Sequence, residues 1–119
     1  MILKTFESKK INLDKNKIVL FYGQNEGHKK EEISKLLIAN KNREIIKYSE
    51  NEILENSENF YNHILSESLF SQKKIIIVNR ASDKIFKIIE YLNNKSFSDV
   101  FIIINAKNLE KKSKLRSFF

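Results

Sequence analysis

The chain has 119 residues, of which 41% are hydrophobic and 31% are charged, and its formal net charge is +7. This balance fits one globular domain and excludes a disordered chain, whose apolar content would be lower. The absence of cysteine excludes disulfides and a thiolate zinc site. The apolar runs are far shorter than the roughly 20 residues of a membrane helix. We therefore expect a soluble, cytoplasmic protein that makes no contact with a membrane.

The positive charge allows two interpretations. A basic surface is typical of proteins that bind nucleic acids. Here the lysines are scattered among glutamates, and the abundance of Lys, Asn and Ile together with the absence of Pro and Trp indicates A/T-rich coding. The composition therefore favours a solvated surface over a dedicated patch for nucleic acid.

The first half of the chain predicts an alternation of strands and helices. Residues 1–17 form a lead-in, and the continuous apolar run at 18–22 predicts the first buried strand. Helical spacing follows at 31–40, then a weaker strand suited to a sheet edge at 44–48. A second helical stripe covers 53–65.

The second half continues this alternation. It predicts a strand at 75–78, a helix at 85–92 with Ser82 or Asp83 as its cap, and a strand at 100–104. Unbroken runs rich in β-branched residues are typical of parallel strands that are covered on both faces. Together these elements predict an α/β fold, a three-layer sandwich with a mostly parallel sheet.

The last residues of the chain are unusually apolar. A basic helix is predicted to begin in 107–119, and the sequence ends on Phe118 and Phe119, which we expect to be exposed. We therefore expect the first domain of a longer protein, ending where the sheet would take another strand.

The segment after the first strand lies where a nucleotide-binding α/β protein carries its phosphate loop. That loop has the pattern G-x-x-x-x-G-K-[ST], in which lysine binds the terminal phosphates and the hydroxyl binds Mg²⁺. Gly23 and Lys29 match this pattern. Gly27 comes one position early, so His28 stands where glycine belongs, and Lys30 replaces the hydroxyl. The loop is degenerate and is not expected to bind nucleotide; its glycines are interpreted as residues of a strand-to-helix turn.

The rest of a phosphate-transfer site is also missing. An ATPase of this architecture carries acidic residues at the end of its third strand to hold Mg²⁺, where this chain has Asn79 and Arg80. Asn105 is interpreted as a turn residue after the last strand. His28 and His63 have no partner at the spacing of metal ligands. We therefore expect no catalytic residue, no metal site and no cofactor.

Two large apolar residues interrupt the polar linker before the third buried strand. Leu69 and Phe70 lie between Ser68 and Ser71. Because Leu69 follows Leu65 by about one helical turn, the pair can extend a buried helical stripe. Alternatively, it protrudes and inserts into a pocket of another protein. The residues alone favour the first interpretation and leave the second open.

Four segments, taken in order and with their spacing, resemble one protein family. They are ILKTFE at the start, FYGQNEG after the first strand, SLFSQKKIIIV in the middle, and VFIIINAKNLEKKSKLRSFF at the end. With the degenerate phosphate loop, they make the chain similar to the N-terminal domain of the delta subunit of bacterial DNA polymerase III, a clamp-loader component.

The resemblance implies that residues 1–119 form an AAA+-like domain, related to P-loop NTPases, that does not hydrolyse ATP. In this family the delta subunit acts in DNA replication: it binds the sliding clamp (the beta subunit) and favours its open form, so that the clamp is placed on primed DNA. The implied partners are the clamp, the ATPase and delta-prime subunits of the loader, and DNA through the complex. Leu69 and Phe70, flanked by Ser68 and Ser71, stand at the positions that enter an apolar pocket on the clamp. Family members continue into lid and collar domains, which are not among these residues.

Two other functions remain open. One is a divergent nucleotide-binding ATPase domain that uses Lys29 or Lys30, and it predicts magnesium-dependent binding of nucleotide. The other is a basic α/β domain that binds nucleic acid, and it predicts an affinity that falls steeply with salt.

Overall fold

The computed structural model describes residues 2–4, 18–23, 26–65, 73–95, 100–107, 109–110 and 112–118. Within these residues one sheet is formed by five strands: β1 (Ile2–Lys4), β2 (Ile18–Phe21), β3 (Glu44–Ser49), β4 (Lys74–Ala81) and β5 (Val100–Ala106). The strand order is β1-β2-β5-β4-β3, and every pairing is parallel. The predicted α/β class with a parallel sheet is therefore confirmed, and β3 lies at an edge as predicted.

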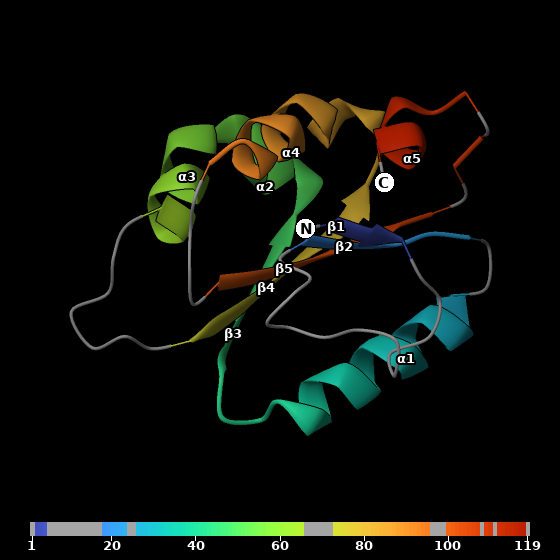
Figure 1. Ribbon diagram of the computed structural model, residues 1–119, viewed down its shortest axis with the longest axis vertical. Coiled ribbons are helices and arrows are strands. Elements are labelled where there is room, and N and C mark those ends of the chain that lie inside the picture. The colour runs from blue at the N-terminus through green and yellow to red at the C-terminus, as the bar shows by residue number, and fades with distance from the viewer. Residues whose placement is uncertain are drawn as a thin grey trace.

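Helices cover both faces of the sheet (Figure 1). One face carries α1 (Glu26–Ala39), and the other carries α2 (Glu50–Glu55), α3 (Ser57–Leu65), α4 (Phe86–Asn93) and α5 (Lys114–Phe118). A short 3-10 helix, η2 (Asp83–Ile85), leads into α4; Ser82, one of the two predicted caps, caps η2, whereas α4 itself has no side-chain cap. The result is the predicted three layers. No helix in the described part of the chain is both long and apolar enough to cross a membrane.

The alternating side chains of the central strands divide the core into two clusters. In β5, Ile102 and Ile104 belong to the cluster with α2, α3, α4 and α5, whereas Phe101 and Ile103 belong to the cluster with α1. All four are buried. A central strand of this sheet has no solvent face, so its sequence is continuously apolar and does not alternate with polar residues.

The lead-in contributes a strand to the sheet. Residues 2–4 form β1, which pairs with β2 and occupies the edge beside it.

The helical stripe predicted at 53–65 is divided into two helices. Asn56 separates α2 from α3, and its Oδ1 accepts a hydrogen bond from the Asn59 amide at 3.2 Å. An asparagine side chain that binds a backbone amide in this way starts a new helix. The α2 helix has its own start signal, a capping box between Ser49 and Glu52.

The prediction that Phe118 is exposed is wrong. Its ring packs edge-on against Phe86, with 5.5 Å between ring centroids, and it lies against the larger core cluster. Leu115, in the same helix, is fully buried. The end of the described chain therefore docks on the helical layer. Phe119 lies outside the described residues.

Candidate functional site

The segment that begins at Gly23 lies at the carboxyl end of the sheet, next to the end of β5. From β2 the chain continues into α1 on one face, and α5, after β5, lies on the other face (Figure 1). Ligands of open α/β sheets bind where neighbouring strands send their connections to opposite faces. The degenerate phosphate loop thus occupies the position at which a ligand site is expected.

Lys29 lines a pocket of about 480 Å³ together with Asn79, Arg80 and Asn105, but its own side chain is almost wholly buried. It is only 2% exposed, and its Nζ donates hydrogen bonds to Glu26 Oε1 at 2.7 Å and to the Ala106 carbonyl at 2.6 Å. The lysine therefore joins the start of α1 to the end of β5. Its charge is compensated by a carboxylate of its own helix, in a charge-assisted hydrogen bond.

The two glycines have different roles. Gly23 has a φ of 127°, which other residues adopt only at a cost, and its amide donates to the Lys107 carbonyl at 3.2 Å. The turn interpretation of Gly23 is therefore confirmed. Gly27 lies inside the first turn of α1, so it is a helical residue and does not belong to a turn. Lys30 is exposed on the same helix.

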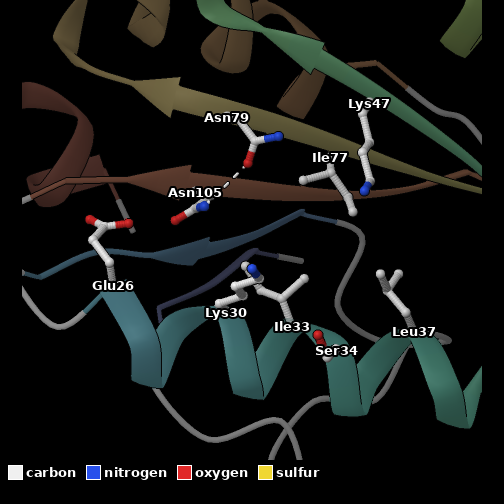
Figure 2. Close-up of a pocket in the computed structure, with 9 residues that line it drawn as sticks. All are labelled: Glu26, Lys30, Ile33, Ser34, Leu37, Lys47, Ile77, Asn79 and Asn105. Atoms are coloured by element: carbon white, nitrogen blue, oxygen red, sulfur yellow. Dashed lines mark hydrogen bonds between the residues drawn. The ribbon is translucent and has the colours of Figure 1, made fainter.

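Asn79 and Arg80 lie at the carboxyl end of β4, as predicted, but Asn105 is not a turn residue. It lies within β5 in register with Asn79, and its Nδ2 donates to Asn79 Oδ1 at 3.2 Å (Figure 2). Asn105 Oδ1 is buried and has no hydrogen-bond partner among the described residues. The two strand ends therefore carry a pair of neutral amides where an ATPase carries carboxylates for Mg²⁺.

Arg80 interrupts the pairing of β4 with β5. Its φ is 58°, and the register shifts between Asn79 and Ala81. A β-bulge of this kind bends the strand and redirects the neighbouring side chains. Positive φ is uncommon outside glycine and occurs often at functional sites.

The two histidines are not brought together. His28 lies on α1 and His63 on α3, on opposite faces of the sheet (Figure 1). His63 Nδ1 forms a hydrogen bond with the Tyr48 hydroxyl at 2.5 Å. In the described part of the chain, no group of three or more acidic or histidine side chains is arranged to hold a metal ion.

The residues predicted to bind a sliding clamp lie outside the described part of the chain: Ser68, Leu69, Phe70 and Ser71. Of the described residues on either side, α3 ends at Leu65, and the Lys73 carbonyl, just before β4, accepts a hydrogen bond from the Glu44 amide at 3.0 Å.

No protein-family model matches this chain, and neither the curated proteins nor the solved structures include a match.

Proposed function

We propose that this chain is the clamp-binding module of a replication clamp loader, similar to the N-terminal domain of the delta subunit of bacterial DNA polymerase III. It has an AAA+-like fold and does not hydrolyse ATP. It binds the ring-shaped sliding clamp through Leu69 and Phe70 and favours the open ring. The ATPase and delta-prime subunits of the loader then place the clamp on primed DNA.

The observation that carries this proposal is the state of the phosphate loop. Lys29 is buried and bound to Glu26 and to the Ala106 carbonyl. The end of β4 offers Asn79 and Arg80, and neither can supply a carboxylate to Mg²⁺. The domain has the layout of a nucleotide-binding protein but lacks a free loop lysine and the carboxylates that bind Mg²⁺. Such a domain is suited to binding another protein.

The sequence of the linker supports a protein partner. It holds two large apolar residues, Leu69 and Phe70, between the polar Ser68 and Ser71. Burying a leucine and a phenylalanine in a partner pocket contributes about 3–6 kcal/mol before the costs of association. Two anchors of this size dominate a small interface.

The double substitution Leu69→Ala, Phe70→Ala tests the proposal. We expect it to weaken binding to the purified cognate sliding clamp by about a hundredfold or more, because both anchors are lost. The melting temperature should stay the same, since protruding residues add nothing to the core. Calorimetry against the clamp and thermal unfolding are the measurements. The matched control replaces two apolar residues that are exposed elsewhere, Ile38 and Leu54, by alanine and should keep full affinity.

Two results would contradict the proposal or its site. A wild-type chain that does not bind the clamp contradicts the function. A melting temperature that falls by about ten degrees in the double variant shows that Leu69 and Phe70 belong to the core.

A further inference from the structure

A cleft lies between α1 and the sheet, beside the loop that begins at Gly23. Its volume is about 320 Å³, and its walls come from α1, β3, β4 and β5 (Figure 2). The cleft exists because α1 is the only described helix on this face and does not reach the edge of the sheet. Beyond it, Ile45 of β3 is 40% exposed.

The cleft has an apolar floor and cationic sides. Ile33 and Leu37 of α1 and Ile77 of β4 supply the floor. Lys30 extends from α1 and Lys47 from β3, and the two side chains approach the space between helix and sheet from opposite sides (Figure 2). Both lysines are exposed, and within the described residues neither forms an ion pair.

Among the residues that the structure describes, no acidic side chain pairs with Lys30 or Lys47. The carboxylate at the mouth of the cleft belongs to Glu26, which already pairs with the buried Lys29. The cleft therefore has two ammonium groups available to an anion. Lys29, the residue that a phosphate loop would use, does not line it.

The amide pair closes the cleft at the strand ends. Asn79 Oδ1 accepts from Asn105, and the Asn79 nitrogen lies on the side away from Asn105, toward Lys47 (Figure 2). Asn105 Oδ1 is buried without a donor among the described residues, and it points toward Glu26, away from the two lysines (Figure 2).

We propose that this cleft binds a small organic anion. Its phosphate or carboxylate group lies between Lys30 and Lys47, and its apolar body lies on Ile33, Leu37 and Ile77. The volume is at the lower end of the range for small-molecule sites, which combine apolar walls with a few polar groups. The inference does not depend on clamp binding, because neither Leu69 nor Phe70 is among the residues that line the cleft.

Three probes with the same ring test the chemistry of the ligand. The whole chain is titrated with phenyl phosphate, benzoate and benzyl alcohol, and binding is followed by calorimetry and backbone amide chemical shifts. We expect saturable binding of at least one of the two anions, with shifts at Lys30, Lys47 and Asn79. Benzyl alcohol, which has no charge, should bind at least about tenfold more weakly than the better of the two anions. The two anions distinguish a phosphate site from a carboxylate site.

Four variants locate the site. Lys30→Gln and Lys47→Gln should each weaken anion binding about fivefold, because each removes one charge. Lys87→Gln is the matched control: this lysine is exposed on α4, on the other face, and its loss should change affinity by less than about twofold. Ser34→Trp places a large ring at the exposed edge of the cleft and should abolish binding without lowering the melting temperature.

Several results would overturn the inference. One is that neither anion saturates the protein at about 10 mM, and another is that benzyl alcohol binds with the same affinity as the anions. A third is that Lys87→Gln and Lys47→Gln lower the affinity for the anion equally, and a fourth is that a folded Ser34→Trp variant binds the anion with unchanged affinity.

Discussion

Lys29 stabilises the fold through the same side chain that would bind phosphate in a nucleotide-binding protein. Its substitution by methionine keeps a long apolar stem but removes the donor to the Ala106 carbonyl and the cation beside Glu26. A buried acceptor left without a donor costs about 1–3 kcal/mol. We therefore expect Lys29→Met to lower the free energy of unfolding by about that amount, as measured by urea denaturation.

Lys35→Met is the matched control for this substitution. Lys35 is on the same helix, its side chain is exposed, and its Nζ lies 3.5 Å from the exposed Glu31 carboxylate and 3.5 Å from that of Glu32, which is largely buried. Surface pairs contribute little to stability, so its loss should leave the unfolding curve almost unchanged. Equal effects of the two substitutions would show that the contacts of Lys29 are no stronger than those of a surface lysine.

Some single-residue roles could be predicted and others could not. The sequence indicates that Asn79 and Arg80 end a strand, because they follow an apolar run, and the structure places them there. It does not indicate that Asn105 pairs with Asn79, because this contact depends on the register between two strands. The sequence does contain one sign of this pair: both asparagines directly follow an apolar run.

At the scale of elements, Asp83 attaches α5 to the rest of the protein. Its carboxylate accepts hydrogen bonds from Ser113 Oγ at 2.5 Å and from the Leu115 amide at 3.1 Å. The Ser113 bond lowers the pKa of Asp83 below 3.8, partial burial opposes this change, and the backbone amides of Leu115 and Lys114 lower the pKa further. A carboxylate whose pKa is depressed by folding stabilises the protein above its unfolded pKa, and this contribution is lost as pH falls through the folded pKa.

The substitution Asp83→Asn should therefore have an effect that depends on pH. At neutral pH it should cost about 1 kcal/mol, the usual value for losing the cap of a helix start. The difference from wild type should narrow as pH falls below 3.8, because the wild-type carboxyl is then neutral as well. Denaturant unfolding over a pH series measures this. Glu55→Gln, at an exposed position of α2, is the control and should show no such narrowing.

The helical stripe at 53–65 shows why element boundaries are harder to predict than elements. Ile53, Phe60 and Ile64 are all buried against the same core cluster, so the apolar period continues across the break at Asn56. The docking of Phe118 on Phe86 could not be predicted for a different reason. It joins two helices that are far apart in the chain, and a pattern within one helix does not show it.

At the scale of the whole molecule, stability should be greatest at the centre of the sheet. β2, β4 and β5 lie inside it, whereas β3 is at an edge and is largely solvent-exposed. Backbone amide hydrogens exchange with solvent most slowly where the surrounding structure is buried on all sides. We expect native-state hydrogen exchange to be slowest in β4 and β5 and clearly faster in β3. Similar rates in β3 and β5 would contradict this gradient.

The class and the layers of the fold could be predicted because each central strand is apolar on both faces, as at Ile75, Ile76 and Ile77. The order of the strands could not, because it depends on which strand each crossover reaches. The cleft between α1 and the sheet could not be predicted from the sequence for the same reason. Its sides are Lys30 and Lys47, and its closed end is Asn79 and Asn105, residues that only the strand order brings together.

The strand order also determines when the protein can fold as it is made. Among the described strands β5 comes last in the sequence, yet it lies between β2 and β4, and Ile18 pairs with Ile102. Until β5 has left the ribosome, β2 has only the short β1 to pair with, and β4 lacks one of its two neighbours. Pairings between such distant parts of a chain form slowly. Of the described strands, β2 and β4 therefore lack their shared neighbour until β5 has been made, and the sheet is completed only when β5 is inserted between them.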